Sequence, residues 1–268
     1  MSCEEVKIKL SKVFVYPIKA LPAVELETVR ITEGGALYND RRWGIVDQKG
    51  RMVNGKNNKR LFSLKPTFDL ELETVSFLEG ENTRETFDLA NLSGLSKYFS
   101  KALKQPVFLK ENKKQGFPDD ITASGPTVVT QASLETVASW YPDLSLDDIR
   151  ARFRVNLELS PAPAFWEDGL FKRDRQPKSL QIGDVFIHVS NPCARCSVPI
   201  KHPETGEPYN NFYETFIAQR KQTRPDWLDP ACFDHWYRLS LNTNIGLEQA
   251  KKALTVGDAV KTYETPYF

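Results

Sequence analysis

Apolar and polar residues alternate along much of the first half of the chain, in short segments that end at turn-forming residues. In the segment 24–31, Val-Glu-Leu-Glu-Thr-Val-Arg-Ile, the alternation extends over eight positions. This period of two is typical of a strand with one buried face. Similar segments lie at positions 9–17, 68–75 and 85–89. Many short strands joined by turns favour a barrel or a sandwich, so the pattern predicts a mainly β protein.

Helical periodicity interrupts this pattern at a few places. Residues 92–104 predict a helix, because their apolar side chains fall on one stripe. Ser133 has the side chain of an N-cap residue, so we expect a helix to begin there. Short helical segments are also predicted at 147–152 and 213–221. The segment 111–120 is polar and rich in turn-forming residues, which predicts a linker.

Strands return in the second half of the chain, at positions 126–130, 153–159 and 182–189. The start of the last of these, Ile182-Gly-Asp-Val, is echoed near the end of the chain by Thr255-Val-Gly-Asp-Ala-Val. The echo is too short to be a repeat. It predicts two strands that are entered by similar turns.

Composition narrows the possible functions. The 268 residues include 36 Lys and Arg against 35 Asp and Glu, so the net charge is +1. This balance does not indicate broad attraction to nucleic acid or to an anionic membrane. The charged N-terminus lacks the apolar core of a signal peptide, and no apolar stretch reaches the ~18 residues that a membrane helix needs. The four cysteines are unevenly spaced, unlike a secreted disulfide framework, so we expect a cytoplasmic protein.

The segment with the most specific chemistry is Asn191-Pro-Cys-Ala-Arg-Cys, which ends at Cys196 and precedes a loop rich in Pro and Gly. The predicted strand before this segment would place Cys196 at the start of the loop that follows. An adjacent guanidinium, here that of Arg195, favours the thiolate form of cysteine. The thiolate is both the nucleophile and a soft metal ligand. For Cys193 we favour a packing role.

Several motifs in order resemble a known family. Ile182-Gly-Asp, Cys-x-Arg-Cys and Pro-x-Thr-Gly resemble the MOSC domain, the C-terminal part of molybdenum cofactor sulfurases. Tyr16-Pro-Ile-Lys-Ala, the segment 34–43 and the segment 46–53 are similar to the β-barrel domain that precedes MOSC. Mitochondrial amidoxime-reducing components and their bacterial relatives share this pairing. The resemblance covers roughly residues 10–262.

The resemblance implies two β-barrel domains packed together. The N-terminal β-barrel domain would span residues 1–110 and the MOSC β-barrel domain residues 120–268. Residues 207–238, with three prolines and several aromatic side chains, would form a helical insertion beside the site. The cofactor would lie in the cleft between the domains.

The resemblance also implies a molybdenum cofactor, a molybdenum ion held by the dithiolene of a molybdopterin. Cys196 would be the protein thiolate on the metal. Lys19, Arg41 and Arg154 would hold the phosphate and the pterin, since guanidinium groups bind phosphate oxygens in a fixed orientation.

Four further residues are weaker candidates for cofactor binding. Thr130 and Ser133 lie in a stretch similar to the family's Ser-x-Ala-Ser-Leu, where a helix N-terminus faces the cofactor and favours an anion. Ser133 is equally explained as a helix cap. Asn156 follows Arg154 in a Phe-Arg-x-Asn motif, and Arg195 lies beside the ligand cysteine.

Three functions follow from these residues. The first is a molybdenum-dependent reductase of N-hydroxylated bases, amidoximes or N-oxides, small molecules that would lose oxygen as water. The chain has no dinucleotide fingerprint and no four-cysteine iron–sulfur spacing, so electrons would come from a partner protein of the ferredoxin, flavodoxin or cytochrome b5 type. The second is a carrier of the cofactor or a sulfur-transfer protein.

The third is a structural zinc protein. Cys193 and Cys196 with Cys232 and His235 would supply four tetrahedral ligands. The gap of 35 residues between the two pairs is longer than the ~12–20 residues usual for zinc fingers and ribbons, which disfavours this reading.

Overall fold

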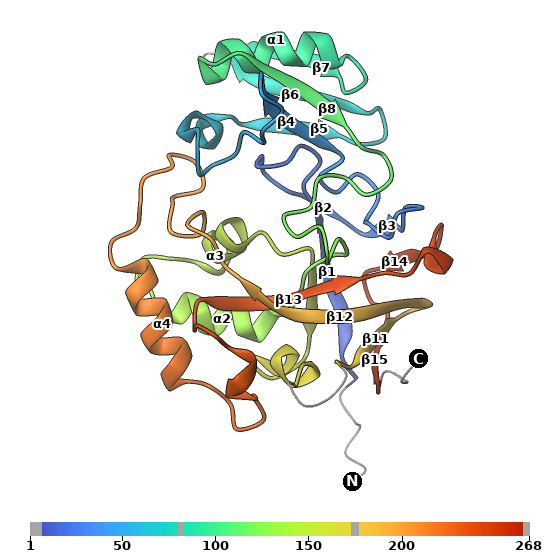
Figure 1. Ribbon diagram of the computed structural model, residues 1–268, viewed down its shortest axis with the longest axis vertical. Helices are drawn as coiled ribbons and strands as arrows, with labels where there is room; N and C mark the ends of the chain where they lie inside the picture. Colours follow the sequence, from blue (N-terminus) through green and yellow to red (C-terminus); the bar gives the residue numbers. More distant parts are fainter. Residues whose placement is uncertain (1–6, 80–82, 173–176, 265–268) are drawn as a thin grey trace.

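The largest sheet brings strands from both ends of the chain together (Figure 1). Its eight strands run in the order β15-β11-β12-β13-β9-β10-β1-β2. The computed structural model describes residues 7–79, 83–172 and 177–264. The strands of this sheet are β1 (Lys9–Val15), β2 (Val24–Leu26), β9 (Val128–Thr130), β10 (Leu157–Ser160), β11 (Ser179–Ile182), β12 (Val185–Ala194), β13 (Arg238–Asn244) and β15 (Val260–Tyr263).

A second lobe stands above this sheet in Figure 1 and contains smaller sheets covered by one long helix. β4 pairs with β8, and β5, β6 and β7 form a three-stranded sheet. β3 pairs with β14 beside the large sheet. These elements are β3 (Thr28–Arg30), β4 (Trp43–Asp47), β5 (Pro66–Asp69), β6 (Thr74–Glu79), β7 (Thr83–Asp88), α1 (Leu92–Leu103), β8 (Val107–Glu111) and β14 (Ala253–Thr255).

Three helices cover one face of the large sheet. They are α2 (Gln131–Ser139), α3 (Leu146–Phe153) and α4 (Phe212–Gln222). Alternation along the strands explains this layer. Val129 of β9 packs among the helices, whereas its neighbour Val128 packs in the cluster on the other face. The described ranges also contain the short 3-10 turns η1 (Lys59–Ser63), η2 (Trp166–Leu170), η3 (Pro230–Cys232) and η4 (Leu247–Gln249).

The mainly β class is confirmed, but the expectation of two barrels is wrong. Within the described ranges no continuous ladder closes the large sheet. β15 and β2 are its outer strands, although the Val260 amide of β15 donates to the Ile8 carbonyl beside β1 at 2.9 Å. The upper lobe divides its strands among separate sheets. β1 and β2 also lie in the sheet of the second half of the chain, although they belong in sequence to the predicted N-terminal domain. Local alternation identifies strands, but it carries no information on which strands close on one another.

Three strands predicted as continuous are interrupted. Residues 24–31 divide into β2 and β3, and residues 68–75 contain the turn between β5 and β6. The segment 182–189 contains a two-residue turn, because Ile182 pairs with Val185 across Gly183. In each case two consecutive residues without an apolar side chain shift the alternation at the break, at 27–28, 73–74 and 183–184, and apolar residues resume beyond it.

The echoed Gly-Asp motifs are confirmed as similar turns. Gly183 leads into β12 and Gly257 into β15, and both glycines have positive φ, 55° and 96°. The helices predicted at 92–104, 147–152 and 213–221 correspond to α1, α3 and α4. No helix in the described part of the chain is both long and apolar enough to cross a membrane.

The cap of α2 differs from the prediction. Thr130 is the N-cap residue, and its hydroxyl accepts a hydrogen bond from the Ser133 amide at 3.3 Å. α2 therefore begins at Gln131, two residues before the predicted cap. Thr130 and Ser133 are both suitable capping residues, so the sequence alone does not distinguish them.

A buried polar cluster joins α2, η2 and α4. The hydroxyl oxygens of Thr130 and Ser133 each lie 3.0 Å from Glu167 Oε2. Asp168 forms an ion pair with Arg220 in which both side chains are almost fully buried. Burial, and then the nearby Asp168 charge, raise the pKa of Glu167 to about 7.

Glu167→Gln should alter how stability depends on pH. The folded-state pKa lies above the value of 4.5 expected in the unfolded chain, so the folded protein binds more protons between these values. The free energy of unfolding should therefore fall as the pH rises from about 4.5 to about 7. The variant should lack this fall and be up to about 3 kcal/mol more stable than the wild type at pH 8.

Urea unfolding at pH 5, 6, 7 and 8 measures this difference. The matched control is Glu135→Gln, which removes an exposed carboxylate of α2 and should follow the wild-type curve. Parallel pH curves for wild type and Glu167→Gln would show that Glu167 titrates normally.

Candidate functional site

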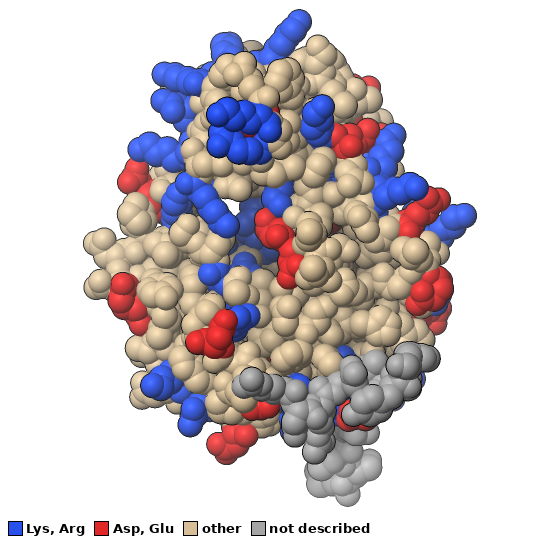
Figure 2. All heavy atoms as spheres, in the orientation of Figure 1, with Lys and Arg blue, Asp and Glu red and all other residues tan. Residues whose placement is uncertain are grey.

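A cavity of about 970 Å³ opens between the two lobes. Figure 2 shows it as a hollow with several Lys and Arg side chains around it. Its walls include Gly55 and Phe62 of the upper lobe, residues of the predicted linker, and the segment that contains Cys196. Of the eight site residues predicted from the sequence, the structure brings six to this cavity: Lys19, Arg41, Arg154, Asn156, Arg195 and Cys196.

Tyr16 forms a platform for two of the cations. The guanidinium carbons of Arg154 and Arg41 lie 4.2 Å and 5.1 Å from the centre of its ring, within the range of cation–π attraction. The Tyr16 hydroxyl donates to the Val155 carbonyl at 3.1 Å. Burial raises the pKa of Tyr16 to about 12, against the opposing effect of the two arginines, so the ring stays neutral.

Arg41 has its charge balanced inside the protein. It forms an ion pair with Asp40, and its Nη1 donates to Asn156 Oδ1 at 3.3 Å. Although burial opposes it, the attraction of Asp40 and then Asp119 raises the pKa of Arg41. Arg41 therefore remains charged beside the cavity.

Arg154 differs, because its guanidinium lacks a carboxylate partner. Its Nη2 donates to the Leu21 carbonyl at 2.6 Å, and no ion pair joins it to a carboxylate in residues 7–79, 83–172 or 177–264. Burial lowers the pKa of Arg154. Both Arg154 and Arg41 have a left-handed backbone, with φ of 55° and 49°. Arg154 is also the C-cap residue that follows α3.

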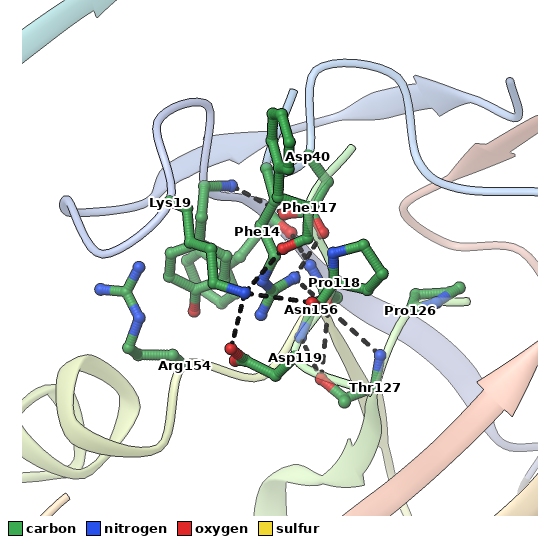
Figure 3. A network of polar contacts seen from close by, with 12 residues as sticks. Phe14, Lys19, Asp40, Phe117, Pro118, Asp119, Pro126, Thr127, Arg154 and Asn156 are labelled. Carbon is green, nitrogen blue, oxygen red and sulfur yellow. Dashed lines mark hydrogen bonds and ion pairs between the residues drawn. The ribbon is translucent and has the colours of Figure 1, made fainter. Parts of the chain in front are cut away.

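Lys19 is held by the linker between the lobes (Figure 3). Its ammonium group donates to the carbonyls of Phe117 at 2.8 Å and Pro118 at 3.1 Å, and it lies 2.7 Å from Asp119 Oδ1. These three acceptors match the three N–H donors of a lysine. Burial lowers the pKa of Lys19, and Asp119 opposes this shift. Lys19 thus anchors the linker at the edge of the cavity.

Asn156 connects three segments beneath the cavity. Its Oδ1 accepts bonds from the Thr127 amide at 3.1 Å and the Thr127 hydroxyl at 3.2 Å, in addition to that from Arg41. Its Nδ2 donates to the Phe14 carbonyl at 3.0 Å. The side chain is fully buried, so its contacts position Arg41 and β1.

Thr130 and Ser133, the other two predicted site residues, are not among the residues that line the cavity. Both are fully buried, and their hydroxyls face Glu167 in the cluster under α2. Their side chains therefore serve the cap and the buried carboxylate.

The two cysteines of the Cys-x-Arg-Cys motif differ in exposure. Cys193 lies near the end of β12 and is partly buried, whereas Cys196 is exposed in the loop that follows. The Cys196 sulfur accepts a weak bond from the Val198 amide at 3.5 Å. Arg195 Nη1 donates to Cys193 Sγ at 3.1 Å, so the guanidinium expected near Cys196 contacts the other thiol.

The loop after Cys196 attaches to the upper lobe. Lys201 Nζ donates to the Gly55 carbonyl at 2.6 Å. Gly206 has φ of 74° and lies so close to Phe62 that a Cβ atom would be 2.7 Å from its ring. Only glycine fits this position, which explains the Gly of the Pro-x-Thr-Gly motif. The loop therefore closes one side of the cavity.

The structure adds three residues that the sequence analysis did not single out as functional: Tyr16, Asp40 and Asp119. Tyr16 and Asp40 lie inside the motifs that were recognised, so their positions offered a signal. Asp119 lies in a segment interpreted only as a linker. Its approach to Lys19 depends on the path of that linker and leaves no pattern in the sequence.

The ligand set for a structural zinc ion is not assembled. In the part of the chain that the structure describes, no group of three or more His, Cys, Asp or Glu residues is placed to hold a metal ion. Cys232 lines the same cavity as Cys193 and Cys196, but His235 does not join them in such a group.

Comparisons with known proteins match nearly the whole chain. The family models of the MOSC N-terminal beta barrel domain and of the MOSC domain match residues 7–118 and 120–261. A molybdenum cofactor sulfurase of Drosophila melanogaster is 27% identical over 231 residues, which cover 74% of this chain and 28% of that protein. The human molybdenum cofactor sulfurase is 23% identical over 261 residues, 79% of this chain and 28% of that protein.

The chain thus spans little more than a quarter of the length of these curated relatives. A crystal structure of a hypothetical protein aligns with 97% of this chain and 69% of its own, at 9% identity and a TM-score of 0.42. A likeness at that level carries no argument about fold or function.

Asn156→Ala should destabilise the protein substantially. The variant would leave the Thr127 amide and the Phe14 carbonyl without their side-chain partner, at a cost on the order of 2–4 kcal/mol. Asn242→Ala is the matched control, because Asn242 donates one side-chain bond, to Asn191, and its loss should cost about 1 kcal/mol. Urea unfolding compares the two, and equal losses would contradict the connecting role of Asn156.

Proposed function

Since the chain belongs to the MOSC domain family, we propose that it is a molybdenum-cofactor-binding oxidoreductase that reduces N-hydroxylated or N-oxide substrates. The observation that carries this proposal is one cavity that presents both an exposed cysteine thiol and a guanidinium that no carboxylate of the described ranges pairs with. The thiol is that of Cys196 and the guanidinium that of Arg154.

The residues of the cavity fit such a cofactor. A thiolate is a soft ligand suited to a metal that already carries sulfur ligands. An uncompensated guanidinium is suited to the terminal phosphate of a pterin cofactor, because it binds phosphate oxygens through paired N–H donors. A volume of about 970 Å³ is at the upper end for ligand sites, which favours a cofactor together with a small substrate.

Each residue then has a distinct task. Cys196 would hold the metal, and Arg154 with Arg41 would hold the phosphate. Asn156 keeps the Arg41 guanidinium in place, and Lys19 fixes the linker that borders the cavity. When bound, the cofactor would supply two-electron chemistry that removes oxygen from the substrate as water, while the protein binds and orients both.

The electrons would come from a partner protein. The sequence contains neither a dinucleotide fingerprint nor the cysteine spacing of an iron–sulfur cluster. We therefore propose a donor of the ferredoxin, flavodoxin or cytochrome b5 type. Because Cys196 is exposed, the site has the access from outside that such a donor requires.

A carrier or sulfur-transfer role is the second candidate. It is favoured by the relatives, which are named molybdenum cofactor sulfurases, and by the contact of Arg195 with Cys193. A second thiol beside an arginine in the same cavity is suited to receive sulfur from another protein. The two roles make different demands, because a reductase must turn over substrate and a carrier must release its cofactor.

Turnover with a chemical reductant separates the two roles. The protein produced in a host that makes the cofactor should convert an amidoxime to the amidine with reduced viologen dye and no partner protein. Product formation is followed by chromatography. Fully loaded protein that reduces no amidoxime, hydroxylamine or N-oxide, yet restores activity to a cofactor-free molybdenum enzyme, would establish the carrier role instead.

Cys196→Ala should abolish both molybdenum retention and dye-driven turnover, since it removes the proposed metal ligand. Cys193→Ala is the matched control and should retain most of both. Metal analysis of the purified variants and circular dichroism, to verify folding, are the measurements. Equal losses in both variants, or full molybdenum content in Cys196→Ala, would contradict the assignment of the ligand.

A further inference from the structure

Asp119 places a negative charge among the cations of the cavity. Its Oδ1 lies 2.7 Å from Lys19 Nζ, and Figure 3 shows the carboxylate directed to the lysine from the linker. The side chain is 81% exposed, and Asp119 is among the residues that line the cavity. Desolvation by the neighbouring atoms raises the pKa of Asp119. The positive charges of Lys19, Arg41 and Arg154 outweigh this effect and lower the pKa to about 2. Asp119 is therefore charged at every physiological pH.

Three cations lower the pKa of Asp119, and they differ in their ion pairs. Arg41 is paired with Asp40, and Lys19 is paired with Asp119, whereas Arg154 forms no ion pair with any carboxylate that the structure describes. An anionic ligand attracted by Arg154 would approach the same group of cations that attracts Asp119. The carboxylate would then repel the ligand or leave its place on Lys19.

The linker allows Asp119 to leave that place without unfolding. Lys19 also holds the carbonyls of Phe117 and Pro118, and the Phe117 amide donates to the Arg41 carbonyl at 2.8 Å. Gly116 packs so closely on the turn that contains Asp40 and Arg41 that a Cβ atom would lie 2.5 Å from the Asp40 carbonyl oxygen. These backbone contacts hold the linker whether or not the Asp119 side chain is paired.

We propose that Asp119 is a built-in competitor that determines which anions the Arg154 site accepts. Its carboxylate occupies the cations that a ligand phosphate would use, so a ligand must displace it. A small free anion such as inorganic phosphate gains too little binding free energy from Arg154 alone to displace the carboxylate. A phosphate that belongs to a ligand with further contacts in the cavity gains more and displaces the carboxylate. Selection by a repulsive element of this kind raises specificity at the expense of affinity.

This inference deepens the proposed function and rests on it only for the identity of the physiological anion. The competition itself requires no metal, no pterin and no thiol. It can therefore be tested on the full-length chain from a host that does not make molybdopterin, with inorganic pyrophosphate as the probe.

Asp119→Asn should bind pyrophosphate about tenfold more tightly than the wild type, because one nearby negative charge is removed from the site. Isothermal titration calorimetry at constant ionic strength measures the dissociation constant. Arg154→Gln introduced into Asp119→Asn should abolish this gain, since Arg154 is the receiving cation. Asp119→Glu retains the charge and should bind as weakly as the wild type.

Asp120→Asn is the matched control. It changes the net charge of the same cavity equally, but the Asp120 carboxylate accepts bonds from the Thr122 amide and hydroxyl, and no ion pair holds it among the described residues. Its affinity for pyrophosphate should rise far less than that of Asp119→Asn, because the substitution releases no cation. If Asp119→Asn does not fold, Asp119→Ser tests the same charge removal.

Three results would overturn the inference: no increase in affinity for Asp119→Asn, an equal increase for Asp120→Asn, or no pyrophosphate binding by any variant. The outcome is separate from the proposed function. Protein that shows the expected competition but never retains molybdenum would leave Asp119 as the competitor and remove the oxidoreductase proposal. Protein that retains molybdenum but shows no competition would support the oxidoreductase proposal and remove the inference about Asp119.

Discussion

The antiparallel pairing of β1 with β10 is the contact on which the site depends. Its register runs from Lys9 opposite Ser160 to Val13 opposite Leu157, so the chain leaves β1 beside the residues that precede β10. Tyr16 therefore arrives next to Arg154, although 138 positions separate them in the sequence. Two hydrogen bonds between Asn156 and Phe14 secure this junction where the ladder ends: the Asn156 side chain donates to the Phe14 carbonyl, and the Phe14 amide donates to the Asn156 carbonyl. A backbone pairing thus gathers cations that local sequence could not bring together.

Sequence periodicity identified elements better than it identified architecture. The helix α1 was predicted because a helical stripe needs only neighbouring residues, and it lies within one residue of the expected range. The turn at Gly183 was concealed because apolar residues continue on both sides of it. Barrel closure was predicted wrongly, since closure depends on partners that are remote in sequence. Alternation specifies a face of a strand and leaves its neighbours open.

In the candidate site too, the sequence predicted single residues better than the contacts between them. Motifs pointed to Cys196, Arg41 and Arg154, and the structure brings all three to one cavity. What the motifs could not predict is how the charges are shared. Arg41 is balanced by the residue beside it, whereas Lys19 is occupied by a linker that passes almost a hundred positions later. Such pairings follow from the path of the backbone, which no single segment encodes.

The left-handed backbone at Arg41 and Arg154 bears on any attempt to make this protein more heat-resistant. A residue with a Cβ atom in that conformation costs on the order of 1–2 kcal/mol, and glycine avoids the cost. Glycine at position 41 would leave the buried Asp40 carboxylate without its ion-pair partner, which outweighs this gain. Screening for thermal tolerance alone would therefore enrich glycine at position 154 and remove one of the two guanidinium groups beside Tyr16. Selection for robustness and selection for ligand capture pull that position in opposite directions, so an engineering campaign should hold Arg154 constant.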